Sequence, residues 1–530
     1  MRRSSKLAAR PWWRKATTAL AGVLAVASAA APAAAAERTK DLDLVVRTAY
    51  GAVEGRKLGD AQAFLGLPFA EPPVYERAWK RPVEPRAWRG VRDATRQEAA
   101  CLQFEPTGVK NDQPTSLDCL YLDVYRPARA RKGEKLPVMV FYHGGAGTQG
   151  SGVLYGGQTM ASRDDVIVVS TNYRLGAAGN LALPALDGED PGAGGNFALL
   201  DQVQALKWVH GSIAAFGGDT GNVTVFGQSA GARAVCNLLA TPLTEGLFHR
   251  AIMESSPCLG GGTVKETAQR RSEAYAAAVG CPAGPGQLGC LRSAWPAGLV
   301  QSFAGNRPSG YVGASSLPLA SGDAISSGKW HRVPVIVGNT RWEQKLQNQQ
   351  HADITEDQYE AIVIEQFGAT AGPLVLAEYP ASAYERPFYA LAAMRTDAGA
   401  GCTVDANARL FLDQDVPVYR YLFDDPTSPT LFGFQPEGID MSSAHSGELA
   451  YLFDFTLGDR PLTSRQERLA HAMQDYWTAF ARFGEPKARD QVTWPRHTEA
   501  GDKALRLAPE IEVTTGLRDL HNCDFFADLP

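Results

Sequence analysis

Short apolar runs alternate along this chain with longer stretches in which apolar residues recur every three or four positions. The short runs are the kind of segment buried in a parallel sheet: Val138–Tyr142, Val166–Ser170, Val223–Phe226, Val333–Val337 and Val418–Phe423. Two of the longer stretches predict helices. One is Phe197–Ile213 with a single apolar face, and the other runs from a Ser464 cap to a stop at Gly484.

This alternation continues over several hundred residues and predicts an α/β fold. We expect one large domain built on an open, mostly parallel sheet with helices on both faces. Mostly helical excursions are expected within 262–330 and 350–410. Ligands in such a fold bind at the carboxyl ends of the strands, so we expect the functional residues there.

The first 36 residues do not fit the alternation. Basic residues fill the beginning (Arg2, Arg3, Lys6, Arg10, Arg14, Lys15), and an uncharged stretch of Ala, Val and Leu follows and ends at Ala33–Ala36. This order is typical of a secretory signal peptide, cleaved near Ala36. A membrane anchor is the alternative, but the apolar core is short and mostly alanine. We therefore expect 37–530 to be the mature, secreted domain.

The charge of the expected mature chain disfavours two classes of partner. The whole chain has a formal net charge of −5, and removal of six cations with residues 1–36 leaves −11. An acidic protein without a basic tract is a poor candidate for binding nucleic acid or an anionic membrane. No later segment reaches about 18 consecutive apolar residues, so no stable membrane anchor is expected either.

The chain has eight cysteines, an even number, and export permits disulfides. No CxxC pair occurs, which disfavours a zinc site and a thioredoxin-like redox pair. We expect structural disulfides and no metal, although cysteine spacing alone leaves the pairing open.

A candidate nucleophile follows the strand Val223–Phe226. The next residues are Gly227-Gln228-Ser229-Ala230-Gly231, and a helix-compatible run then extends to about Ala240. This is G-x-S-x-G in the strand-turn-helix context in which a serine hydroxyl is exposed on a sharp, strained turn. A Gly/Ser turn without catalytic function is the alternative, and the position directly after the strand favours a nucleophile.

Collinear segments across the chain resemble type B carboxylesterases of the cholinesterase-like group. The resemblance is carried by Phe64–Pro73, Asp118–Leu122, Asn172–Gly176, Gly195–Gln202, Phe216–Asp219 with 227–231, and Tyr476–Ala481. It implies the α/β-hydrolase fold and hydrolysis of carboxylic esters of small molecules without a metal or organic cofactor.

The resemblance also implies a role for each site residue. Ser229 is the nucleophile, His445 in the His-x-x-Glu-Leu pattern is the base, and Glu343 after the strand Val333–Val337 orients it. The family usually has Asp-Glu-Gly where this chain has Trp342-Glu343-Gln344. The oxyanion donors are the backbone amides of Gly145, Ala146 and Ala230.

The glycines near the oxyanion loop also fit a different class. Gly145-x-Gly147-x-x-Gly150 after a strand matches a dinucleotide fingerprint, which requires an acidic residue at the end of the next strand. That strand is followed by Thr171-Asn172, so nicotinamide and flavin binding are disfavoured.

Disulfide pairing follows from the same resemblance. The implied pairs are Cys101–Cys119, Cys281–Cys290, Cys236–Cys258 and Cys402–Cys523.

Substrate choice stays open at this level. Choline esters are disfavoured, because the loop Cys101–Cys119 has no tryptophan and Gln228 replaces the glutamate that precedes the nucleophile in cholinesterases. A lipase acting on long-chain glycerides and a catalytically silent interaction protein remain as alternatives. The natural ester and the oligomeric state are not determined by the sequence.

Overall fold

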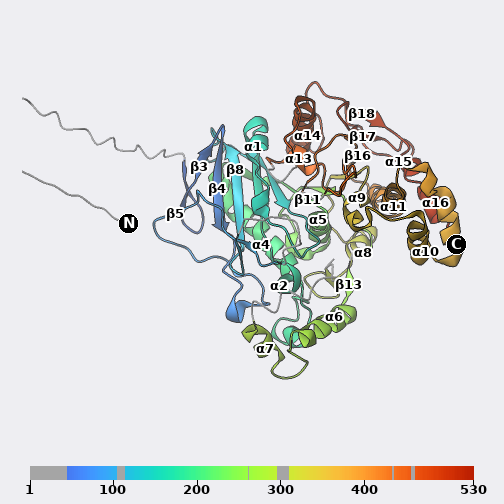
Figure 1. The fold of residues 1–530 in the computed structure, drawn as a ribbon. Helices are drawn as coiled ribbons and strands as arrows, with labels where there is room; N and C mark the ends of the chain where they lie inside the picture. Colours follow the sequence, from blue (N-terminus) through green and yellow to red (C-terminus); the bar gives the residue numbers. More distant parts are fainter. Residues whose placement is uncertain (1–43, 104–113, 261, 295–309, 432–434, 455–459) are drawn as a thin grey trace, which may run out of the picture. The chain divides into compact units, whose positions relative to one another are not determined.

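The fold is centred on a mixed sheet whose middle strands are parallel (Figure 1). The structure is a computed structural model that describes residues 44–103, 114–260, 262–294, 310–431, 435–454 and 460–530. The expected signal peptide, residues 1–36, lies outside this range.

Within the described residues, the main sheet has eleven strands in the order β18-β17-β16-β15-β12-β11-β9-β10-β8-β4-β3. The strands from β10 to β17 in this order pair in parallel, and β8, β4, β3 and β18 pair antiparallel at the two edges. Their bounds are β3 Arg56–Leu58, β4 Ala61–Pro68, β8 Tyr121–Pro127, β9 Leu136–Tyr142, β10 Ile167–Thr171, β11 Gly218–Gln228, β12 Arg250–Glu254, β15 Val335–Thr340, β16 Val418–Phe423, β17 Ala504–Leu507 and β18 Glu512–Thr514. All five runs predicted from the sequence are strands of the parallel part, β9, β10, β11, β15 and β16.

Small sheets accompany the main one. They are formed by β1 Val45–Arg47, β2 Ala52–Glu54 and β5 Val91–Asp93, by β6 Ala100–Cys101 and β7 Thr115–Ser116, and by β13 Thr263–Val264 and β14 Tyr311–Val312.

Helices follow most strands and cover both faces of the sheet, as expected for the α/β-hydrolase fold. Their bounds are α1 Gln158–Asp164, α2 Gly176–Gly179, α3 Pro184–Glu189, α4 Phe197–Ser212, α5 Ala230–Ala240, α6 Lys265–Ala278, α7 Gln287–Ser293, α8 Ser321–Ser326, α9 Gln344–Gln347, α10 Glu356–Glu378, α11 Pro387–Thr396, α12 Cys402–Leu412, α13 Leu449–Leu452, α14 Ser464–Phe483, α15 Leu517–Leu520 and α16 Cys523–Ala527. Helices α6 to α8 lie in the first expected excursion and α10 to α12 in or at the end of the second.

Two apolar cores lie on the two faces of the sheet, because successive side chains of a strand point to opposite sides. In β9, Val138 and Val140 join the core that contains residues of α4 and α5, whereas Met139 and Phe141 join the core that contains residues of α14. The strand is buried over its whole length, which explains why its sequence reads as a continuous apolar run.

Two helix predictions need correction. Helix α4 is buried on nearly every side rather than on one apolar face. Its Asp201 is fully buried, and an ion pair with Arg174 (2.7 Å) compensates the carboxylate for the loss of water. Helix α14 is capped by Thr463 and not by Ser464, because Thr463 and Gln466 form a reciprocal capping box. Its end at Gly484, with φ of 75°, agrees with the prediction.

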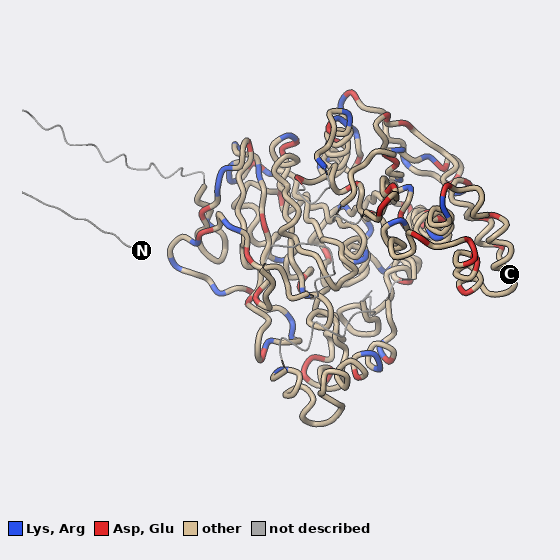
Figure 2. The backbone as a smooth tube through the Cα atoms, viewed as in Figure 1, with Lys and Arg blue, Asp and Glu red and all other residues tan. Residues whose placement is uncertain are grey.

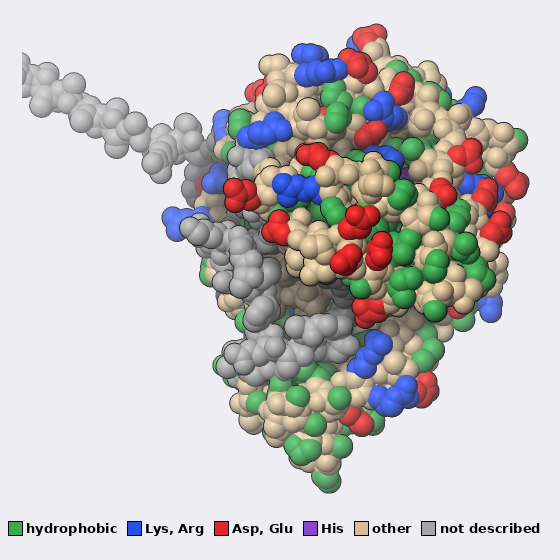
Figure 3. Space-filling model, turned by 45° about the vertical axis from the view of Figure 1, so that its right-hand side comes forward, with side chains coloured by type: hydrophobic (Ala, Val, Ile, Leu, Met, Phe, Trp, Pro, Cys, Tyr) green, Lys and Arg blue, Asp and Glu red, His purple; other side chains and the backbone are tan. Residues whose placement is uncertain are grey.

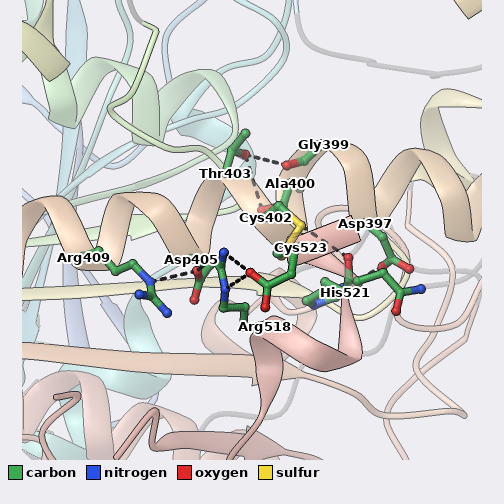
Figure 4. Close-up of a disulfide and its surroundings, with 12 residues drawn as sticks. Asp397, Gly399, Ala400, Cys402, Thr403, Asp405, Arg409, Arg518, His521 and Cys523 are labelled. Carbon is green, nitrogen blue, oxygen red and sulfur yellow. Dashed lines mark hydrogen bonds and ion pairs between the residues drawn. A yellow bond between two sulfur atoms is a disulfide. The ribbon is translucent and has the colours of Figure 1, made fainter. Parts of the chain in front are cut away.

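The C-terminal segment is attached to the second excursion (Figure 4). A disulfide joins Cys402 at the start of α12 to Cys523 at the start of α16. Beside it, His521 Nδ1 lies 2.7 Å from a carboxylate oxygen of Asp397, in the π-helical turn between α11 and α12. Arg518 and Asn522 add polar contacts to Asp405 (3.0 Å) and to the hydroxyl of Tyr379 (3.0 Å), so a disulfide and several polar contacts hold the end of the chain.

Charged residues of both signs are interspersed along the described chain (Figure 2). Figure 3 likewise shows basic and acidic side chains next to each other on the face that it presents. Among the helices that the structure describes, none is long and apolar enough to cross a membrane.

Candidate active site

The turn between β11 and α5 holds Ser229 in a backbone conformation that few residues adopt. Ser229 has φ of 58° and ψ of −119°, and its amide donates to the carbonyl of Glu254 at the end of β12 (2.8 Å). Only glycine fits at the two flanking positions, 227 and 231, because other backbone atoms lie very close to them. A Cβ at Gly231 would lie 1.8 Å from the carbonyl oxygen of Tyr142, and one at Gly227 would lie 2.5 Å from the carbonyl carbon of Gly231. The strained turn exposes Ser229 at the carboxyl end of the sheet.

The predicted acid and base meet across 102 positions of the chain. Glu343 follows β15, is 2% exposed, and accepts a hydrogen bond through Oε1 from the amide of Thr340 (2.8 Å). Its Oε2 is hydrogen bonded to Nδ1 of His445. The carboxylate is therefore fixed at one oxygen by its own loop and at the other by the imidazole.

The second nitrogen of the His445 ring faces the serine turn. Nε2 lies 3.2 Å from the side-chain amide nitrogen of Gln228, the residue before Ser229. An amide N–H can only donate, so the neutral ring carries its proton on Nδ1, toward Glu343, and offers Nε2 as an acceptor. This is the tautomer that a general base needs.

The predicted oxyanion loop lies against the serine turn. A Cβ at Gly144 would lie 3.3 Å from Cβ of Ser229. Gly145 and Ala146 both have positive φ, 101° and 56°, and turn the loop sharply after β9. Within the described residues, the amides of Gly145, Ala146 and Ala230 have no hydrogen-bond acceptor, so all three donors remain available for a ligand oxygen.

His143 lies at the start of this loop and contacts it. Its ring stacks on Tyr173 (centroids 4.4 Å apart), and its Nδ1 lies 2.8 Å from the carbonyl oxygen of Gly144. Burial lowers the pKa of His143 to about 4, so the ring is neutral at ordinary pH.

Two further carboxyl groups lie buried near the acid. Glu448 accepts from Ser255 Oγ (3.2 Å), and Glu254 accepts from Nε1 of Trp477 (2.8 Å). Burial raises the pKa of both glutamates to about 8, and for Glu448 the charge of Glu343 adds to the effect. Both are therefore largely protonated at neutral pH. Glu254 was not identified from the sequence. The signal that could have indicated it is its position at the end of β12, the strand next to β11.

The structure contains four disulfides, and they join the pairs that the resemblance implied. They are Cys101–Cys119, Cys236–Cys258, Cys281–Cys290 and Cys402–Cys523, and no cysteine is left free. Cys236 lies in α5, so one bridge ties the helix after Ser229 to the segment after β12.

Comparison with known proteins gives consistent matches over nearly the whole chain. The model of the carboxylesterase family matches residues 42–526. The fumonisin B1 esterase of Sphingopyxis macrogoltabida is 34% identical over 508 residues, covering 92% of this chain and 90% of that protein. The para-nitrobenzyl esterase of Bacillus subtilis is 33% identical over 498 residues, covering 88% and 96%. A solved structure of a PNB esterase superposes with a TM-score of 0.75 at 30% identity, covering 91% of this chain and all of that one.

Proposed function

Because this chain belongs to the carboxylesterase family and is a carboxylic-ester hydrolase, we propose that it cleaves small-molecule esters through an acyl-enzyme on Ser229. The hydroxyl of Ser229 attacks the ester carbonyl carbon while Nε2 of His445 takes its proton. Glu343 stabilises the imidazolium that forms. The oxygen of the tetrahedral intermediate, which carries the negative charge, accepts hydrogen bonds from the amides of Gly145, Ala146 and Ala230.

Collapse of that intermediate breaks the bond to the alcohol, which leaves with the proton held by His445. A water molecule then attacks the acyl carbon, and His445 again takes a proton. The bond from this carbon to Ser229 Oγ breaks, His445 returns the proton to that oxygen, and the carboxylic acid is released. Every proton moves through one imidazole nitrogen, and the chemistry requires no cofactor.

One observation carries this proposal: the opposite nitrogens of the His445 ring face Glu343 and the turn of Ser229. A surface histidine would not bond to a buried carboxylate on one side and lie beside a strained G-x-S-x-G turn on the other. The three amides without acceptors are independent support, because two belong to the loop that directly follows Gly144, which lies against Ser229, and the third directly follows Ser229.

We also propose that the protein acts outside the cell, as the domain 37–530. The four disulfides support this, because such bonds persist in oxidising compartments. Mass spectrometry of the secreted protein tests the proposal, with a new N-terminus near Glu37 as the expected result.

The activity is tested with p-nitrophenyl esters from acetate to palmitate. Wild type should turn over at least one ester, Ser229→Ala should lose about 10³-fold or more in kcat, and the exposed-helix control Ser326→Ala should not. A fluorophosphonate probe should label wild type and the control but not Ser229→Ala. Absence of both turnover and labelling in folded wild type would overturn the proposal, and the chain-length optimum distinguishes an esterase from a lipase.

A further inference from the structure

Lys345 lies two positions after Glu343 and is almost fully buried, with 3% of its side chain exposed. Burial of an ammonium group is costly unless its hydrogen bonds are satisfied. Burial lowers the pKa of Lys345, and the carboxylate of Asp440 opposes that effect. A residue kept in so unfavourable an environment needs a structural or chemical reason.

The partners of the ammonium belong to the loop that carries His445. Nζ of Lys345 lies 3.1 Å from Oδ2 of Asp440 and 3.1 Å from the carbonyl oxygen of Ser442. The Asp440 carboxylate also accepts from the amide (3.0 Å) and the hydroxyl (2.7 Å) of Ser442. Lys345 thus holds a segment that already has a fixed shape, three to five positions before His445.

Two aromatic rings also lie within cation–π distance of the ammonium. Nζ lies 4.9 Å from the ring centroid of Trp342 and 5.5 Å from that of Tyr389 in α11. The Tyr389 hydroxyl accepts from the amide of Asp440 (2.8 Å). Cation–π attraction is strongest for a cation removed from water, as this one is.

A second contact joins the same two loops at the other end. The amide of Trp342 donates to the carbonyl of Ser443 (3.0 Å), and Trp342 forms a parallel bridge with Ala444. The Glu343–His445 bond lies between residues fixed in this way. A second charged contact between the two loops is the ion pair of Lys345 with Asp440.

We propose that Lys345 is a positioning residue: its ammonium holds the loop that carries Glu343 against the loop that carries His445. The inference rests on the proposed function, because the positioned pair is the acid and base assigned above. In the sequence this segment is where Trp342-Glu343-Gln344 departs from the usual pattern of the family, and Lys345 directly follows that departure.

The test compares Lys345→Met with wild type and two controls. Methionine keeps most of the apolar stem and removes the ammonium, and the Asp440 carboxylate left behind is 63% exposed and can be solvated. Lys265→Met removes an ion pair between Lys265 in α6 and Asp187 in α3 (2.8 Å), and Leu291→Ala removes buried side-chain volume in α7. We expect Lys345→Met to lower kcat by about tenfold to a hundredfold with KM little changed, since a displacement of about 1 Å has that effect.

A readout that does not depend on turnover is the proton that His445 Nδ1 shares with Glu343. It should give a far-downfield resonance in the proton NMR spectrum of the wild type and of both controls, and the resonance should shift or disappear in Lys345→Met. An unchanged resonance with unchanged kcat would overturn the inference. So would a loss of kcat that Leu291→Ala reproduces while the resonance of Lys345→Met stays in place.

Asp440→Asn weakens the same ion pair by removing the charge of its exposed partner. This variant replaces Lys345→Met in the test if Lys345→Met does not fold. It should reduce kcat by about twofold to tenfold and shift the same resonance, and no effect on either would overturn the inference. If wild type neither hydrolyses esters nor reacts with the phosphonate, the proposed function fails, while the NMR comparison still decides whether Lys345 positions the pair.

Discussion

Glu254 should make the stability of this protein depend on pH in a way that one substitution reveals. The side chain is fully buried at the end of β12, and its Oε1 accepts from Nε1 of Trp477. Its Oε2 has no hydrogen-bond partner within the described residues. Burial without a compensating cation favours the neutral acid and raises its pKa from 4.5 to about 8.

The direction of the effect follows from the two pKa values. Below pH 4.5 the carboxyl is protonated in both folded and unfolded chains, so burial carries no ionisation cost. Between pH 4.5 and 8 the unfolded chain releases the proton and the folded chain keeps it, so the contribution of Glu254 to stability falls as pH rises. Above pH 8 the loss of stability is complete. The difference between the two pKa values limits this loss to about 5 kcal/mol at most.

Glu254→Gln keeps an oxygen acceptor for Trp477 and cannot ionise. The free energy of unfolding of this variant, relative to wild type, should therefore increase from pH 5 to pH 8 by several kcal/mol and then level off. Urea unfolding at each pH, followed by tryptophan fluorescence, measures this difference. The exposed control Glu499→Gln should show no such trend. A difference between Glu254→Gln and wild type that stays constant from pH 5 to 9 would refute the reasoning.

Three further variants test the framework around the site. Gly231→Ala places a methyl group 1.8 Å from a backbone oxygen of Tyr142, so ester turnover should be abolished, and fully active protein would contradict the close approach. Replacement of both Cys402 and Cys523 by serine should cost about 2–5 kcal/mol in a thermal melt, because the bridge closes a loop of 121 positions; an unchanged midpoint would show that the bridge adds nothing. Arg174→Met leaves its partner Asp201 in α4 buried and unpaired, which should lower the free energy of unfolding in urea by about 3–5 kcal/mol. A decrease below about 1 kcal/mol would contradict the burial of this ion pair.

Much of the scaffold could be predicted because its signals are local. The valine-rich runs became central strands, and the turn at Ser229 is encoded by Gly227 and Gly231 within five consecutive residues. The end of α14 at Gly484 is equally local, since a left-handed residue after a helix favours glycine. The resemblance to carboxylesterases added the expected partners, and the structure brings Glu343 and His445 together as that resemblance implied.

The sequence by itself thus determined the α/β class, the serine turn and the family, since each depends on neighbouring residues or on collinear motifs. The tertiary structure decided what depends on distant segments meeting. The sheet order places β9 between β10 and β11, although β9 precedes both in the chain. Apolar periodicity did not reveal that α4 is buried on its polar side, and no local pattern marks Lys345 or Glu254. Their properties arise from burial and from partners on other elements, and a carboxyl or ammonium group acquires its unusual environment only when the chain folds around it.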